Sequence, residues 1–179
     1  MKKYLVIGNP IDHSLSPKLH NYWIKKNKID AIYEKKLLIK GDLEKTILKL
    51  KLGEIDGINV TVPFKNLVIS YVDELSVEAK ETQSVNTIYL KNNKIIGHNT
   101  DIAGFELALM YFKYNVLGKK VLILGAGGVV PSIIFALKKM KASNIVLSNR
   151  TKSKAENIKK IFPEIEIIDW GKTGEFDMI

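Results

Sequence analysis

Three short polar segments carry hydroxyl, amide, amine and carboxyl groups that a fold alone does not require. They are Ser-Leu-Ser-Pro at residues 14–17, Asn-Val-Thr-Val-Pro-Phe-Lys at 59–65 and Asn-Thr-Asp at 99–101. Ser14 and Ser16 lie at a predicted helix start, which favours a carboxylate, although Ser16 also suits an ordinary N-cap. Lys65 follows a predicted strand, and Asp101 lies at a predicted domain junction, where ligand crevices commonly form. Each charge alone is typical of a protein surface.

A glycine-rich turn, Gly-Ala-Gly-Gly at residues 125–128, lies between a predicted strand and a predicted helix. In this context Gly125 makes a tight turn, and Gly127 lets the backbone approach a pyrophosphate that faces the positive end of the helix. Val130 stands where this dinucleotide fingerprint usually has its third small residue. By itself, the segment is also compatible with a plain strand-to-helix connection.

The end of the next predicted strand distinguishes NADP from NAD. NAD sites usually place Asp or Glu about 20 residues after the glycines to bind the ribose, but this strand runs into Asn149-Arg150-Thr151. Arg150 is the single arginine among 28 basic residues. A guanidinium binds phosphate through a planar fork and stacks on adenine, which lysine does less well. These residues, with positive charge added by Lys152 and Lys154, favour NADP over the alternative of a surface arginine.

The elements that position these groups alternate between strand and helix, as in an α/β fold. In the first part we predict strands at 4–7, 31–38 and 57–62, helices at 16–27 and from Gly41-Asp42, and a hairpin at 85–90 and 94–97. In the second part we predict helices at 102–114, 131–140 and 153–161 and strands at 121–124, 145–147 and 165–168. Two domains follow from this pattern, residues 1–101 with a mainly parallel sheet and residues 102–179 with an incomplete Rossmann order. Residues 176–179 read as the start of another buried strand.

Composition excludes several classes of protein. The 179 residues are 46% hydrophobic and 26% charged, enough to bury a core without disulfides or a structural metal. The absence of cysteine excludes disulfides, thiolate zinc sites, iron-sulfur clusters and cysteine nucleophiles, and is compatible with a cytoplasmic location. Three scattered histidines give little support to a metal site, and no apolar run is long enough to span a membrane.

The basic charge does not indicate a nucleic-acid partner. The formal net charge is +9, a value that nucleic-acid binders share. No block of five or six like charges occurs, and the lysine doublets have apolar neighbours, as on a solvated face. We therefore expect small-molecule partners only, and a monomer or homodimer.

Six motifs, in order along the whole chain, resemble those of the shikimate dehydrogenase family. They are Gly8-Asn9-Pro10-Ile11 with His13 to Pro17, residues 59–65, Val85-Asn86-Thr87, Asn99-Thr100-Asp101, residues 125–128 and Asn149-Arg150-Thr151. The resemblance implies a substrate-binding α/β domain followed by a Rossmann domain for NADP(H). It also implies reversible NADPH-dependent reduction of 3-dehydroshikimate to shikimate, in aromatic amino acid biosynthesis.

The same resemblance assigns roles to individual residues. Ser14 and Ser16 would hold the substrate carboxylate, while Thr61, Lys65, Asn86 and Asp101 would meet ring hydroxyls. A carbonyl that receives a hydride becomes an alkoxide and needs a proton, which an ammonium supplies while stabilising the charge. Lys65 is the predicted donor and Asp101 its orienting partner; which of the two carries the proton stays open. The implied cofactor residues are Gly125, Ala126, Gly127, Gly128, Val129, Asn149, Arg150, Thr151 and Lys154.

Several positions depart from the family pattern. Val130 replaces a small residue, Pro131 and Lys154 replace arginines, and Gln83-Ser84 replaces Gly-Ala. The family's chains also continue well beyond residue 179, so we expect a truncated chain whose own activity is open. The alternatives are a quinate/shikimate dehydrogenase paralogue and an inactive fragment that binds substrate or nucleotide. A protein that had lost catalysis would be expected to lack Lys65 or Asp101, and both are present.

Overall fold

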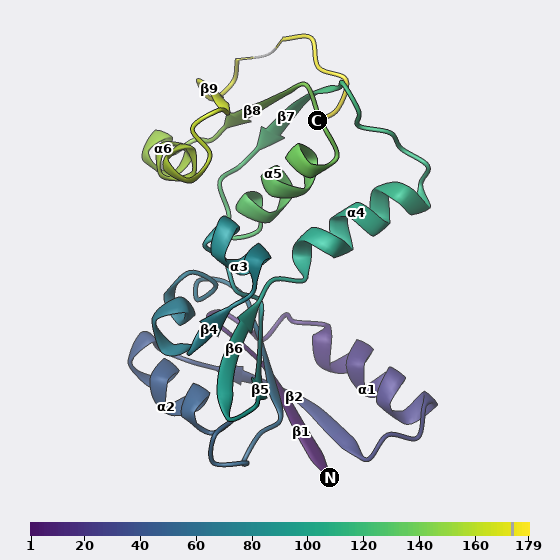
Figure 1. Cartoon of the computed structure of the whole chain (residues 1–179), viewed down its shortest axis with the longest axis vertical. Helices are drawn as coiled ribbons and strands as arrows, with labels where there is room; N and C mark the ends of the chain where they lie inside the picture. The colour runs from purple at the N-terminus through teal and green to yellow at the C-terminus, as the bar shows by residue number, and fades with distance from the viewer. Residues whose placement is uncertain (173) are drawn as a thin grey trace. The chain divides into compact units, whose positions relative to one another are not determined.

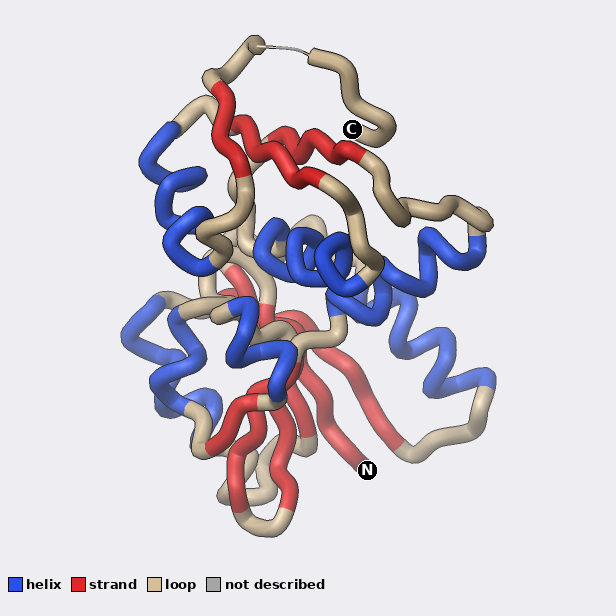
Figure 2. Tube along the Cα trace, turned by 45° about the horizontal axis from the view of Figure 1, so that its top comes forward, coloured by secondary structure: helices blue, strands red, loops and turns tan. Residues whose placement is uncertain are grey.

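The computed structural model describes residues 1–172 and 174–179, which form two compact units. The first unit comprises Met1–Lys80 and Ser84–Asn99, and the second comprises Glu81–Gln83 and Thr100–Ile179. Figure 1 labels the elements of both units. Each unit contains one β-sheet, shown in red in Figure 2.

The sheet of the first unit has six strands in the order β2-β1-β3-β5-β6-β4. The pairs β1·β2, β1·β3 and β4·β6 are parallel, and β3·β5 and β5·β6 are antiparallel. The predicted mainly parallel sheet is therefore confirmed. The bounds are β1 (Lys2–Gly8), β2 (Ala31–Leu37), β3 (Gly57–Val60), β4 (Glu74–Leu75), β5 (Thr87–Lys91) and β6 (Lys94–His98).

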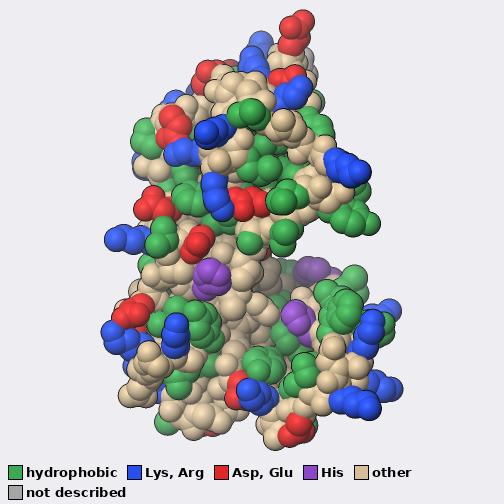
Figure 3. Space-filling view, turned by 45° about the vertical axis from the view of Figure 1, so that its right-hand side comes forward, with side chains coloured by type: hydrophobic (Ala, Val, Ile, Leu, Met, Phe, Trp, Pro, Cys, Tyr) green, Lys and Arg blue, Asp and Glu red, His purple; other side chains and the backbone are tan. Residues whose placement is uncertain are grey.

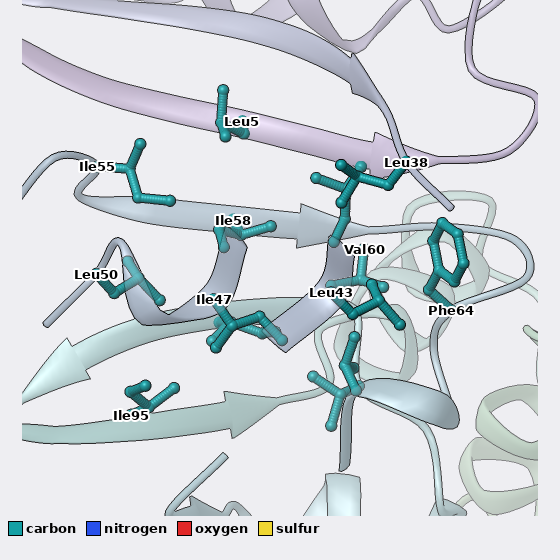
Figure 4. Packing of buried hydrophobic residues seen from close by; sticks show 14 of the residues in the cluster. Leu5, Leu38, Leu43, Ile47, Leu50, Ile55, Ile58, Val60, Phe64 and Ile95 are labelled. Atoms are coloured by element: carbon teal, nitrogen blue, oxygen red, sulfur yellow. The ribbon is translucent and has the colours of Figure 1, made fainter. Parts of the chain in front are cut away.

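Alternating residues of the central strands face two different helices. Leu5 of β1 and Ile58 and Val60 of β3 join the main core on one face. Leu43 and Ile47 of α2 (Leu43–Leu48) pack into this core (Figure 4). Burying each such side chain contributes about 1.5–3 kcal/mol relative to leaving it in water.

The opposite face of this sheet carries a smaller core. Val6, Ile11 and Tyr33 form it, with Tyr4 and Ile24 at its margin. Ile24 belongs to α1 (Ser16–Lys26), and Figure 1 shows α1 and α2 on opposite sides of the sheet. The side chains of Tyr33, Val6, Asn59 and Thr87 share this face, because the register pairs Tyr4 with Tyr33, Val6 with Asn59 and Asn59 with Thr87.

The predicted hairpin is confirmed. Strands β5 and β6 are antiparallel and pair Lys91 with Lys94 across the turn. Asn92 and Asn93 have φ of 51° and 61°, the positive values that a tight two-residue hairpin requires and that asparagine tolerates. The short elements η1 (Lys40–Asp42), η2 (Leu67–Tyr71), β4 and α3 (Val77–Thr82) were not predicted individually.

The second unit has a parallel sheet in the order β7-β8-β9. Its bounds are β7 (Lys120–Leu124), β8 (Asn144–Ser148) and β9 (Glu166–Ile168), with helices α4 (Asp101–Tyr111), α5 (Val130–Lys139) and α6 (Lys152–Ile161). Helices α5 and α6 supply Ile134, Leu137, Ala155 and Ile158 to one core with β8. Met178 forms an isolated parallel bridge with Val121. Residues 176–179 were expected to begin another buried strand, but Ile179 is 75% exposed, so this segment is not a buried strand.

Three predicted details of the elements were wrong. The N-cap of α1 is Leu15, not Ser16, and Ser16 is the first helical residue. Strand β3 ends at Val60 rather than at residue 62, because the chain turns at Thr61 before reaching Pro63. Helix α4 ends at Tyr111 rather than at residue 114, and Phe112 just beyond it is 76% exposed.

Candidate functional site

The candidate substrate residues of the first unit gather at the carboxyl ends of β1 and β3. Because these strands are parallel and adjacent, both end at the same edge of the sheet. Beyond the strands, Thr61 N donates to Ile7 O (2.9 Å) and Asn9 N donates to Val62 O (2.9 Å). A Cβ added to Gly8 would lie 2.5 Å from Thr61 Cγ2, so this close approach requires glycine.

Lys65 is held in place through its backbone. Phe64 is only 2% exposed and its N–H donates to Thr61 O (2.9 Å), closing a turn. Val85 N then donates to Lys65 O (2.8 Å). This bond places half-buried Lys65 beside the segment that carries Asn86.

Asn86 is fixed between two strands at the same edge. Its N–H donates to His98 O (3.0 Å), and its carbonyl accepts from Val60 N (2.8 Å). The structure thus brings Thr61, Lys65 and Asn86 together around the end of β3, although they are separated by up to 25 positions in the sequence.

Ser14 and Ser16 occupy the loop after β1 and the first turn of α1. Ser14 N donates to Ile11 O (3.0 Å), and Ser16 N donates weakly to Ser14 Oγ (3.4 Å). Both side chains are partly exposed. Ser14, rather than Ser16, is therefore the hydroxyl that touches a backbone N–H at this helix start. His13 in the same loop is exposed.

A chain of side-chain hydrogen bonds, which sequence reasoning missed, runs across the α1 face of the sheet. Tyr33 Oη donates to Asn59 Oδ1 (2.7 Å), and Asn59 Nδ2 lies 3.1 Å from Thr87 Oγ1. Thr87 Oγ1 in turn donates to Asn86 Oδ1 (2.9 Å). Burial raises the pKa of Tyr33 well above its ordinary value, so its hydroxyl stays protonated. Neither Tyr33 nor this contact could be identified from residue spacing.

The glycine turn of the second unit has the conformation that its sequence predicts. Gly125 has φ of +114°, which only glycine adopts readily, and its N–H donates to Ser148 O (2.8 Å). Helix α5 follows at once, and Val130 N donates to Gly127 O (3.1 Å). A Cβ built on Gly125 or Gly127 would meet nothing within 4 Å, so open space lies against this backbone.

Arg150 lies beside this turn, at the end of the neighbouring parallel strand. Strands β7 and β8 pair in parallel from Lys120 with Asn144 to Leu124 with Ser148, so their carboxyl ends share one edge. Asn149 Nδ2 donates to Thr151 O (2.8 Å), which shapes the loop around exposed Arg150. Lys154 is also exposed in the first turn of α6, whereas Lys152 pairs with Asp169 (3.9 Å).

Asp101 is the first residue of α4 and belongs to the second unit. Its predicted pairing with Lys65, which lies in the first unit, stays a prediction. Asn99, two residues earlier in the sequence, is 1% exposed and its Nδ2 donates to Ser84 O (2.9 Å), a structural contact within the first unit.

Two further features were sought among the described residues, a cluster of metal-binding side chains and a membrane-spanning helix. Residues 1–172 and 174–179 hold no group of three or more His, Cys, Asp or Glu side chains arranged to bind a metal ion. Among the same residues, no helix has the length and apolar character needed to cross a bilayer. On the face shown in Figure 3, basic side chains are interspersed with acidic and apolar ones.

Two family models match the chain in order. One, described as the shikimate dehydrogenase substrate binding domain, matches residues 6–88. The other, described as shikimate / quinate 5-dehydrogenase, matches residues 106–172. The first match spans Ser14, Ser16, Thr61, Lys65 and Asn86, and the second spans the glycine turn and Arg150.

Known shikimate dehydrogenases resemble the chain both in sequence and in structure. The shikimate dehydrogenase (NADP(+)) of Pelagibacter ubique is 62% identical over 178 residues, which is 99% of this chain and 67% of the relative. The crystal structure of shikimate dehydrogenase from Aquifex aeolicus has a TM-score of 0.86 at 39% identity and covers 94% of this chain and 62% of that chain. Shikimate 5-dehydrogenase from Thermus thermophilus, solved with NADP(H) and shikimate, has a TM-score of 0.84 at 28% identity, covering 94% and 63%.

The chain therefore spans about two thirds of the length of these relatives. The matches run through both units and include Thr61, Lys65 and Asn86 at the end of β3 and the glycine turn at residues 125–128. On these grounds the chain belongs to the shikimate dehydrogenase family.

Proposed function

We propose that this protein catalyses the NADPH-dependent, reversible reduction of 3-dehydroshikimate to shikimate in aromatic amino acid biosynthesis. The observation that carries the proposal is the gathering of Thr61, Lys65 and Asn86 at the carboxyl edge of β1 and β3. This segment lies within the match to the substrate binding domain. We assign residues 1–101 to substrate binding and catalysis and residues 102–179 to NADP binding.

The polar groups of the first unit suit a hydroxylated ring acid. Ser14 and Ser16, at the start of α1, supply hydroxyl donors to a carboxylate next to a helix N-terminus. Thr61 and Asn86 supply short side chains that hydrogen-bond ring oxygens. Their backbones are tied to β1, β3 and β6, so the positions of these donors are fixed before substrate binds.

Lys65 supplies acid-base chemistry to the ring carbonyl. In the reduction direction, hydride adds to the carbonyl carbon and the carbonyl π pair moves onto oxygen. The Lys65 ammonium stabilises this developing alkoxide and donates the proton that makes the hydroxyl. Asp101 orients Lys65 and accepts a hydrogen bond from a ring hydroxyl.

The second unit fits NADP(H), whose nicotinamide supplies the hydride when the cofactor is bound. Open space against Gly125 and Gly127, at the start of α5, suits a pyrophosphate close to the backbone. Arg150, with Lys154 nearby in sequence, suits the 2′-phosphate that distinguishes NADP from NAD. Ala126, Gly128, Val129, Asn149 and Thr151 complete the two loops that hold the cofactor.

A coupled pair of assays tests the proposal. NADPH oxidation with 3-dehydroshikimate is measured on the 179-residue chain and on the same chain extended with the C-terminal third of the Pelagibacter ubique relative. Turnover by either protein supports the function, and turnover by the extended form alone assigns the missing requirement to the added segment. Oxidation of quinate at a rate similar to that of shikimate would favour the quinate/shikimate paralogue. No turnover by either form would refute the assignment.

We also propose a cytoplasmic location and a monomeric or homodimeric state. The absence of cysteine fits a reducing compartment. Sedimentation analysis of the purified chain tests the second proposal, and a tetramer or larger assembly would contradict it.

A further inference from the structure

A single backbone carbonyl determines the direction of the hydrogen bonds that run from Tyr33 to Asn86. Asn59 Nδ2 lies 3.2 Å from Asn86 O, and a carbonyl oxygen only accepts. The amide nitrogen of Asn59 must therefore point toward Asn86. Asn59 Oδ1 consequently faces Tyr33 Oη, which has to donate.

The orientation of the Asn59 amide also determines which hydrogen bond Thr87 accepts and which it donates. The second N–H of Asn59 Nδ2 points at Thr87 Oγ1 (3.1 Å), which accepts it. The hydroxyl proton of Thr87 is then directed to Asn86 Oδ1, 2.9 Å away. Because Asn86 Oδ1 faces Thr87 Oγ1, the NH2 group of the Asn86 amide points away from Thr87.

Tyr33 is rigidly held at the start of this chain of bonds. Its backbone makes two hydrogen bonds with the Asn21 side chain, through Tyr33 N to Asn21 Oδ1 (3.0 Å) and Asn21 Nδ2 to Tyr33 O (2.8 Å). The His20 ring stacks on the Tyr33 ring, with centroids 4.2 Å apart and planes 9° apart. Tyr33 is 5% exposed, so its hydroxyl has little access to water as a substitute partner.

We propose that Tyr33, through Asn59 and Thr87, is a positioning residue that makes Asn86 a hydrogen-bond donor toward the substrate. The proposal rests on the proposed function for the role of Asn86. It implies a preference at this point of the site for a substrate oxygen that accepts, such as a carbonyl or an ether oxygen or a hydroxyl whose proton points elsewhere. If the Asn86 side-chain amide were held in the opposite orientation, its oxygen would instead favour a hydrogen-bond donor of the substrate at the same point.

A ligand-free measurement tests the hydrogen-bond chain itself. The side-chain NH2 signals of Asn86 are followed by 15N NMR in Tyr33→Phe and Thr87→Val, with Tyr89→Phe as control. Tyr89 lies on β5, two residues after Thr87, and its hydroxyl is not part of the chain of bonds. We expect the Asn86 signals to shift in Tyr33→Phe and Thr87→Val and to stay in place in Tyr89→Phe. Unchanged signals in folded Tyr33→Phe would overturn the proposal, whatever the protein binds; if Tyr33→Phe does not fold, Thr87→Val decides.

A binding measurement tests the consequence. Shikimate affinity is determined by titration for the chain, Tyr33→Phe, Asn86→Ala and the double variant. We expect Tyr33→Phe to weaken binding about 3- to 10-fold, as for one hydrogen bond, and to add less than about 2-fold in the Asn86→Ala background. A merely structural role would produce the same loss in both backgrounds and would overturn the proposal. If neither the unmodified chain nor its C-terminally extended form binds shikimate, the proposed function fails while the NMR result still decides the positioning role.

Discussion

Substituting Gly8 by alanine should destabilise the first unit because of one close approach. Gly8 ends β1 beside Thr61, and an added Cβ would lie 2.5 Å from Thr61 Cγ2, 3.0 Å from Ile11 Cδ1 and 3.1 Å from Val62 O. The threonine methyl has room to give only by rotating χ1, and the backbone oxygen must shift. Overpacking of this kind costs about 1–3 kcal/mol.

The opposing effect of the substitution is smaller. Replacing glycine by alanine stabilises a compatible site by about 0.4–1 kcal/mol, because the unfolded chain loses conformational freedom. At Gly8 the steric cost therefore exceeds this gain. Gly41 is the matched control: a Cβ there meets nothing within 4 Å, so Gly41→Ala should be neutral or slightly stabilising.

Tryptophan fluorescence during urea unfolding measures the difference. The chain has two tryptophans, Trp23 in α1 of the first unit and Trp170 in the second unit. A Trp170→Phe background leaves Trp23 as the reporter of the first unit. We expect Gly8→Ala to lower the unfolding free energy by about 1–3 kcal/mol relative to Gly41→Ala. Equal stability of the two variants, within about 0.5 kcal/mol, would refute the steric argument.

Three further substitutions test the catalytic, cofactor and electrostatic arguments. Lys65→Ala should abolish turnover in whichever form is active while leaving NADP affinity nearly unchanged; near-normal turnover would remove Lys65 from the mechanism. Arg150→Ala should weaken NADP binding about 10- to 100-fold, the loss of a charged hydrogen bond, with little change for NAD, and an equal loss for both would exclude 2′-phosphate recognition. The Ile95 N–H (2.7 Å), followed by Lys51, lowers the pKa of Asp73. The stabilising effect of the ionised Asp73 carboxylate is therefore complete above the ordinary pKa of a carboxyl group, about 4, and is lost as the pH falls below that pKa. The difference in urea midpoint between the chain and Asp73→Asn should shrink steadily as the pH falls from about 4 through the lowered pKa of Asp73, and a difference that does not change with pH would contradict the assignment.

Much of the fold and of the candidate site follows from local sequence pattern. The alternation of strand and helix, the Asn92-Asn93 hairpin and the turn at Gly125 each depend on backbone conformations that nearby residues encode. The short elements β4, α3 and η2 were not identified, because two to six residues are too few to show a period. The predicted N-cap at Ser16 was wrong by one residue, because the helix begins at Ser16 itself and its N-cap is Leu15, a residue type that the capping pattern does not favour.

The sequence by itself determined which residues could do chemistry, and the tertiary structure decided which of them meet. Lys65 follows a strand whatever its neighbours are, so its position beyond a strand end was readable from the chain, whereas the turn at Thr61 was not. The contact of Tyr33 with Asn59 and Thr87 was not, because it depends on the sheet order β2-β1-β3-β5 and on the register of strands distant in sequence. Side-chain periodicity fixes the face of a strand but not its partner, and therefore only the assembled sheet orients Asn86.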